Sequence, residues 1–165
     1  MAATEKMFLD KEGNVVPNLS INGILASAVP GLVAGLLEIH QKFGHLKRAQ
    51  VMQPSIRLAE NGFPIYPSLE KALLQKESLL AEDNEASKIF LDQNKLAYPE
   101  GYILKQIDLA KTLKLIAKKG KAGFYSGSTA EEFERFFKTK RGLITKKDLS
   151  LYKVKWKKPL EGHYK

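Results

Sequence analysis

Residues 28–44 read AVPGLVAGLLEIHQKFG, and they decide the fold because the helix they predict is apolar on nearly every side. A surface helix confines its apolar side chains to one stripe. Here only Glu38, Gln41 and Lys42 interrupt the apolar surface. Such a helix must be covered by other elements. It is therefore either the centre of this chain's own core or one half of an interface.

Length and composition predict a single folded segment, residues 1–165. The chain is long enough for one hydrophobic core and too short to expect two. Its 44% hydrophobic and 27% charged residues are typical of a folded protein. The absence of cysteine excludes a disulfide framework, a zinc–cysteine site and a thiol nucleophile. No apolar run suggests a membrane span, and the start MAATEKMFLD predicts no secretory signal.

Local signals predict a mainly helical chain with a few short strands. Pro30 suits the first position of the opening helix, and Gly44 its end. Pro54 predicts either a kink in the second helix or a boundary between two short ones. The segment 86–92 is ambiguous between helix and strand. The other expected elements are a turn or hairpin at 8–20, helices at 46–60, 67–82, 104–119 and 128–141, a short turn of helix from Thr145, and a strand at 152–158.

Two capping boxes are predicted, one at each of the last two helices. Ser128 with Glu131 and Thr145 with Asp148 both place an acid three residues after a hydroxyl residue. In this arrangement, each side chain bonds to the backbone N–H of the other residue. The last strand, 152–158, is predicted from alternating aromatic or apolar residues and lysines, although no partner strand is evident.

No set of side chains in the sequence has the composition and spacing of a catalytic or metal site. His40, His45 and His163 lack the spacing of a metal pair on one helix face. The Pro30–Gly35 stretch lacks the further glycine and the Lys-Ser/Thr pair of a phosphate-binding loop. Gly31 and Gly35 are instead interpreted as sites of close packing by another backbone. The sequence therefore assigns no catalytic, substrate-binding or metal-binding residue, and it predicts no cofactor.

The net charge of +9 is concentrated at the C-terminal end, where residues 138–165 hold 10 basic and two acidic residues. Lysines alternating with Tyr152 and Trp156 permit a nucleic-acid hypothesis, with lysines on phosphates and rings on bases. In a strand, however, the aromatic side chains point away from the lysines, so both cannot face one ligand. A solvated basic face is the preferred interpretation.

Six segments, in order along the whole chain, resemble the gamma-glutamyltranspeptidases. They are MFLD (7–10), VPGLVAGLLEIHQKFG (29–44), IRLAENGF (56–63), GYILKQIDLAKTLKLIAKKGKAGFYSG (101–127), GLITKKDLSLY (142–152) and PLEGHY (159–164). Each segment alone is weak, but six in the order of one family make the resemblance specific. One departure is visible: Arg141-Gly142 stands where the family often has paired glycines.

The resemblance implies an N-terminal nucleophile hydrolase with an αββα fold, made as a precursor that cleaves itself into large and small subunits. The threonine at the start of the small subunit attacks the gamma-glutamyl amide of glutathione or a related compound. Water or an amino acid or peptide then accepts the acyl group. Intact bacterial members are periplasmic or secreted. This chain is similar to the middle of the large subunit only.

The resemblance places the reacting groups outside this sequence. The arginine that grips the substrate carboxylate lies upstream of the MFLD segment in the family, and Arg57 does not match it. None of the threonines 4, 112, 129, 139 and 145 stands in the nucleophile's context. The leading hypothesis is a fragment or split-gene product of such an enzyme, inactive alone, whose partners are the remaining enzyme including its small subunit, or further copies of itself. The alternatives are a non-catalytic helical interaction module and, less favoured, a nucleic-acid-binding protein.

Overall fold

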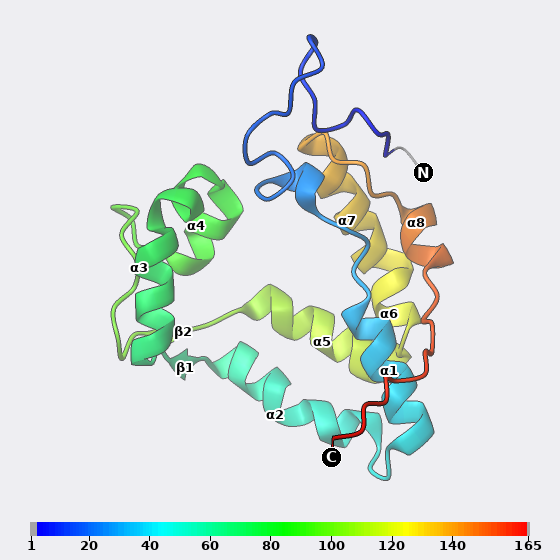
Figure 1. Cartoon of the computed structure of the whole chain (residues 1–165). Coiled ribbons are helices and arrows are strands. Elements are labelled where there is room, and N and C mark those ends of the chain that lie inside the picture. The colour runs from blue at the N-terminus through cyan, green and yellow to red at the C-terminus, as the bar shows by residue number, and fades with distance from the viewer. Residues whose placement is uncertain (1–2, 165) are drawn as a thin grey trace. The chain divides into compact units, whose positions relative to one another are not determined.

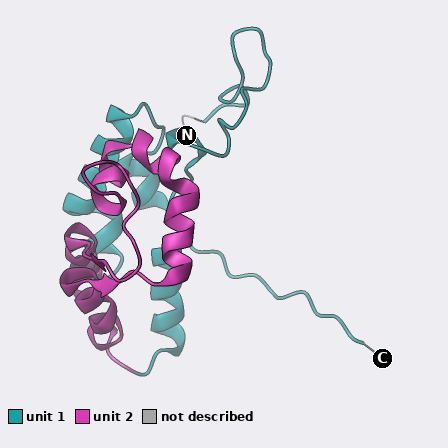
Figure 2. Cartoon of the chain, turned by 90° about the vertical axis from the view of Figure 1, so that its left-hand side faces the viewer, with its two compact units in different colours: residues 1–45, 119–165 teal, residues 46–118 magenta. Residues whose placement is uncertain are grey.

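Short helices make up most of residues 3–164, the part of the chain that this computed structural model describes (Figure 1). The chain divides into two packing units, residues 1–45 with 119–165 and residues 46–118 (Figure 2). Within the described residues, the strands form one small two-stranded sheet. No helix in this part of the chain has the length and apolar content needed to cross a membrane. The prediction of a mainly helical chain is confirmed.

The first unit is built from helices at both ends of the sequence. Its core consists of six buried residues, Ala34, Tyr125, Ala130, Phe137, Ile144 and Leu149. Leu149 is fully buried, because the last helix of the chain packs on the two helices that precede it. The elements are η1 (Ile24–Ala26), α1 (Leu32–Phe43), α6 (Ala122–Tyr125), α7 (Gly127–Thr139) and α8 (Lys146–Leu151).

Helix α1 does not form the centre of this core. It begins at Leu32 rather than at Pro30, and it ends before Gly44 as predicted. Ala34 is its one buried residue, whereas a stripe of large apolar side chains remains exposed. Of the two alternatives left open by the sequence, the one that makes this helix the centre of the chain's own core is therefore wrong. The exposed members of this stripe are Leu32, Leu36, Ile39 and Phe43.

The second unit packs its helices around a smaller core of Ile65, Leu73 and Leu104. Phe63 pairs with Leu104 and Pro64 with Ile103 in the antiparallel sheet, which joins residues far apart in sequence. The ambiguous segment 86–92 lies mostly in a helix, α4. The elements are α2 (Arg48–Asn61), β1 (Phe63–Pro64), α3 (Pro67–Glu82), α4 (Asn84–Phe90), β2 (Ile103–Leu104) and α5 (Ile107–Lys119).

Two predictions in this part of the chain are changed by the structure. Leu104 was expected to begin a helix but belongs to β2, so α5 starts three residues later at Ile107. Helix α2 continues through Pro54 as one element, which excludes the predicted boundary between two short helices. The guanidinium group of Arg48 at the start of α2 donates to the carbonyl oxygens of Ala117 and Lys118, at the end of α5. These bonds tie the two helices together at their ends.

Of the two predicted capping boxes, one is confirmed and one is wrong. At α8, the Thr145 hydroxyl accepts from the Asp148 N–H, and the Asp148 carboxylate accepts from the Thr145 N–H. At α7, Ser126 is the N-cap residue, so Ser128 lies inside the first turn and caps nothing. The hydroxyl of Ser126 donates instead to the carbonyl of Ala122 in the preceding helical turn. Because α6 ends at Tyr125, α7 begins at Gly127, which is earlier in the sequence than the predicted cap at Ser128.

The predicted strand at 152–158 is also wrong, and the corresponding unpaired edge is absent from the described residues. A strand needs a neighbour to bond its backbone groups, and none lies beside this segment. Tyr152 and Val154 pack on the first unit's core. Two of the apolar residues that alternate with lysines in this segment therefore still face the core, although no strand forms. Trp156 is half exposed and contacts the ring of Phe43 and the ammonium group of Lys42.

The Arg141-Gly142 pair ends α7 in a Schellman motif. The Gly142 N–H donates to the Phe137 carbonyl and the Arg141 N–H donates to the Lys138 carbonyl. This motif places the residue after the helix cap in the left-handed region, where glycine is favoured. Arg141 occupies that position with φ of 59°. Gly142 is required for a different reason, because a β-carbon there would overlap Phe137 and Ile24.

Candidate functional site

Hydroxyl groups of four of the threonines considered as nucleophiles bond within their own local structure. Those of Thr112, Thr129 and Thr139 each donate to a backbone carbonyl oxygen, at 2.9 to 3.1 Å. The hydroxyl of Thr145 bonds to the Asp148 carboxylate at 2.7 Å. Within residues 3–164, no three His, Cys, Asp or Glu side chains are grouped so as to hold a metal ion. These threonines serve local structure.

A buried hydroxyl, that of Tyr125, bonds to two backbone groups in the first unit. It donates to the carbonyl oxygen of Pro30 at 2.6 Å and accepts from the N–H of Ala34 at 3.0 Å. The first N–H groups of a helix have no partner inside the helix, and the N-cap residue Gly31 has no side chain to offer. Tyr125 supplies that oxygen from 91 residues away. Burial raises the pKa of the Tyr125 phenol, so the hydroxyl stays protonated and can donate.

The two glycines near the start of α1 differ in their surroundings. A β-carbon at Gly31 would overlap the hydroxyl end of Tyr152, whereas one at Gly35 would meet no atom within 4 Å. The predicted close packing by another backbone is therefore wrong at both positions. At Gly31 the close neighbour is the side chain of Tyr152, and at Gly35 there is none. The Pro30–Gly35 stretch positions α1 in the first unit.

A surface hollow in the second unit has a volume of about 540 Å³. This size falls in the range of ligand pockets. Two tyrosines, two lysines and three aliphatic side chains line it, and no carboxylate does. We call it the tyrosine hollow; its lining residues are Lys88, Ile89, Tyr98, Tyr102, Ile103, Leu104 and Lys105.

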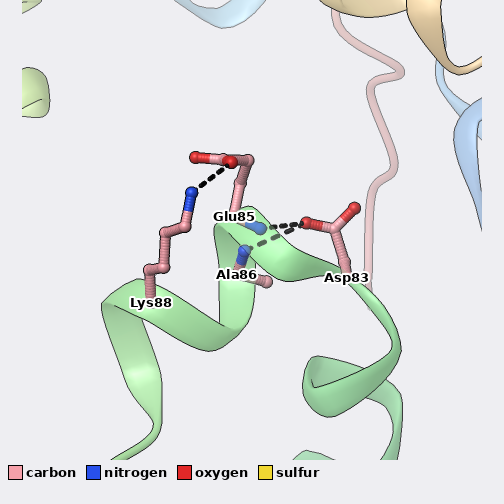
Figure 3. Close-up of polar contacts among 4 residues, drawn as sticks. All are labelled: Asp83, Glu85, Ala86 and Lys88. Carbon is pink, nitrogen blue, oxygen red and sulfur yellow. Dashed lines mark hydrogen bonds and ion pairs between the residues drawn. The ribbon is translucent and has the colours of Figure 1, made fainter. Parts of the chain in front are cut away.

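Helix α4 forms one wall of the tyrosine hollow and is fixed at its start by a cap. The carboxylate of Asp83 accepts from the N–H groups of Glu85 at 2.9 Å and Ala86 at 3.0 Å (Figure 3). One turn on, the ammonium group of Lys88 bonds to the Glu85 carboxylate at 2.8 Å (Figure 3). Both partners are largely exposed, so this ion pair contributes little to the stability of the fold.

Two stacked tyrosines form the opposite wall. The rings of Tyr98 and Tyr102 lie 3.7 Å apart and 2° from parallel. The hydrogen bond to Tyr102, together with burial, raises the pKa of the Tyr98 hydroxyl. The turn between them is anchored to the sheet, because the Gly101 N–H donates to the Ile65 carbonyl and the Ile65 N–H to the Tyr102 carbonyl. These bonds fix the backbone of the turn between the two tyrosines.

Neither tyrosine was predicted as a functional residue from the sequence, although one signal was present. The turn Pro99-Glu100-Gly101 brings its two flanking tyrosines together. The opposite wall could not be found this way, because α4 meets the tyrosines only in the folded unit. A second, smaller hollow of about 290 Å³ lies in the first unit, where Lys146 and Glu131 approach to 3.9 Å.

Comparison with known proteins identifies the family. The family model described as Gamma-glutamyltranspeptidase matches residues 1–165. A glutathione hydrolase proenzyme of Pseudomonas sp. (strain A14) is 38% identical over 166 residues, covering 100% of this chain and 29% of that protein. The corresponding Escherichia coli (strain K12) proenzyme is 36% identical and is covered to 28%. The crystal structure of Helicobacter pylori gamma-glutamyltranspeptidase superposes with a TM-score of 0.96 at 44% identity, over 99% of this chain and 47% of that chain.

These figures also define how much of the relatives the chain represents. The similarity extends over essentially all of this sequence, yet the chain spans less than a third of the length of the two proenzymes. The order of the six recognised segments is therefore explained by common ancestry. The comparisons do not favour the interaction-module and nucleic-acid alternatives.

Proposed function

Because the chain belongs to the gamma-glutamyltranspeptidase family, we propose that residues 1–165 supply a helical, non-catalytic segment of the large subunit of such an enzyme. In this proposal, the segment supports an αββα core from outside. The observation that carries it is the match over the whole chain to only part of much longer proenzymes. The partner is the remainder of the enzyme, including a small subunit.

The reaction of the complete enzyme would be gamma-glutamyl transfer. A threonine hydroxyl on the small subunit attacks the amide carbonyl, the C–N bond breaks, and the amine leaves with a proton. The ester that results is then cleaved by water or by the amino group of an acceptor. The threonines described above bond within local structure and take no part in this step. The side chains of this segment act by packing.

The stripe on α1 supports a packing role. Leu32, Leu36, Ile39 and Phe43 follow a helical spacing and are 73%, 57%, 50% and 59% exposed. Soluble proteins rarely leave contiguous large apolar side chains in water unless another surface covers them. In the complete enzyme, the covering surface would come from polypeptide that the longer relatives contain. Self-association through the same stripe remains a prediction for the chain alone.

Co-production with a complementary polypeptide tests the proposal. The H. pylori enzyme without its aligned segment provides that complement, because the segment that this chain would replace aligns with 99% of the chain at 44% identity. We expect the chain alone to release no chromophore from gamma-glutamyl-p-nitroanilide, and the assembled pair to do so. Leu36→Glu and Ile39→Glu should prevent co-purification, because a carboxylate buried in an apolar contact is strongly unfavourable. Gln41→Glu, on the same helix, is the matched control.

Two results would contradict the proposal. One is threonine-dependent turnover by the isolated chain, which would place the nucleophile within residues 1–165. The other is normal assembly of both stripe variants, which would show that α1 does not face the remaining enzyme. Circular dichroism of each variant confirms that its helices are intact before assembly is measured.

A further inference from the structure

We propose that the tyrosine hollow binds an organic anion with a flat apolar body, such as an aromatic carboxylate. This site is separate from gamma-glutamyl transfer and does not depend on the proposed function. Its lining combines the two features that such a ligand requires, namely cationic groups and an aromatic and aliphatic surface. The ligand's ring would lie against Tyr102 and Ile103, with its carboxylate toward the lysines.

The charges at the hollow favour an anion over a neutral ligand or a cation. Lys88 and Lys105 line it, and no acidic residue does. Among the residues that the structure describes, the carboxylate paired with a lining lysine is that of Glu85, which bonds to Lys88 from within α4. Glu85 therefore offsets part of the Lys88 charge, and Lys105 is expected to contribute more to attraction. A concave site lined by one sign of charge raises the local concentration of the opposite ion.

The apolar surface is exposed where a ligand would need it. Tyr102 is 41% exposed and Ile103 is 49% exposed, whereas their neighbour Leu104 is buried in the core. Aromatic rings stack on other flat groups with a gain beyond simple burial. Because Tyr98 already stacks on one side of Tyr102, the ring is held in place for a ligand. Such preorganisation lowers the entropy lost on binding.

The test is calorimetric titration of the full chain with 2-naphthoate, compared with the uncharged 2-naphthamide. We expect the acid to bind more tightly than the amide. Lys105→Gln should weaken naphthoate binding about two- to fivefold, the range of an exposed charge interaction. Lys88→Gln should have a smaller effect, because Glu85 already pairs with that lysine. Tyr102→Leu should weaken both probes, since both use the ring.

Lys71→Gln and Lys76→Gln on α3 are the matched controls, because they remove the same charge from exposed positions that do not line the hollow. They should leave binding unchanged. Equal affinity for acid and amide, or binding unaffected by Lys105→Gln, would overturn the proposal by locating the probe on another apolar surface such as α1. Absence of binding at millimolar naphthoate would overturn it as well.

Discussion

Replacing Tyr125 by phenylalanine tests how α1 is held in the first unit. The substitution removes one oxygen and leaves the ring in place, so it creates almost no cavity. That oxygen bonds to two backbone groups, the carbonyl of Pro30 and the N–H of Ala34. Tyr125 is 2% exposed, so water cannot readily replace the lost bonds. The change therefore isolates a single hydrogen-bonding group in a packed environment.

The expected cost follows from what is left unpaired. Leaving a buried donor or acceptor without a partner costs about 1 to 3 kcal/mol. Loss of an N-cap interaction alone costs about 1 kcal/mol. We therefore expect Tyr125→Phe to destabilise the first unit by about 2 kcal/mol, combining these two effects. Because about 1.4 kcal/mol corresponds to a factor of ten, amide exchange at Ala34 should accelerate more than tenfold.

Urea unfolding followed by the fluorescence of Trp156, the one tryptophan, reports on the unit that contains Tyr125. Hydrogen exchange measured by NMR gives the Ala34 amide directly. Tyr164→Phe is the control, since that side chain is fully exposed and its hydroxyl should contribute nothing. An unfolding midpoint and an Ala34 exchange rate both equal to those of the unmodified chain would refute capping by Tyr125.

Four further substitutions test local features of the same unit by urea unfolding. Gly31→Ala should destabilise the unit by about 1 to 3 kcal/mol, because the added methyl group overlaps the packed ring of Tyr152. Gly35→Ala should stabilise it by about 0.5 to 1 kcal/mol, because open space surrounds this position and alanine favours a helix. Equal effects at both positions would contradict the packing described. Arg141→Gly should stabilise the unit by up to about 1 kcal/mol, because glycine adopts the left-handed backbone conformation without strain. The conformational entropy that glycine adds to the unfolded chain offsets part of this gain. A lower unfolding midpoint for this variant would show that no strain is stored there. Hydrogen bonds from the side chain and N–H of Thr145 lower the pKa of Asp148. The Asp148 carboxylate therefore stabilises α8 at pH values above its unfolded pKa near 3.8, and this stabilisation is lost as the pH falls through the lower pKa of the folded state. Thr145→Ala should flatten the pH dependence of stability below about pH 4, and an unchanged profile would exclude the box as its source.

Predictions that depend on neighbours in sequence agree best with the structure. Gly44 ends α1 as expected, and α3 begins at Pro67. The box at Thr145 and Asp148 needs only residues within one turn, so its geometry can form without the rest of the chain. The apparently equivalent box at Ser128 fails because the end of α6 sets where α7 begins. The same motif therefore predicts the start of a helix correctly at Thr145, whereas at Ser128 the end of the preceding helix overrides it.

Predictions that need a partner from elsewhere in the chain were less accurate. The 152–158 segment has the alternation of a strand, but no backbone lies beside it to form a ladder. Leu104 fits a helical period, yet pairing with Phe63 places it in β2. The tyrosine hollow was partly accessible to sequence reasoning, since the turn residues Pro99 and Gly101 lie between Tyr98 and Tyr102. Its lysines come from separate segments that only folding brings together.

By itself, the sequence determined the helical character of this chain, most of its helix ends and, through six ordered segments, its family. Each of these depends on spacing along the backbone, which is a covalent property. Only the tertiary structure decided which apolar face is buried and which group caps α1. Gly31 carries no capping atom, and the oxygen that replaces it belongs to Tyr125, far along the chain. A hydrogen bond of that kind has no local signal because its donor and acceptor become neighbours only when the helices pack.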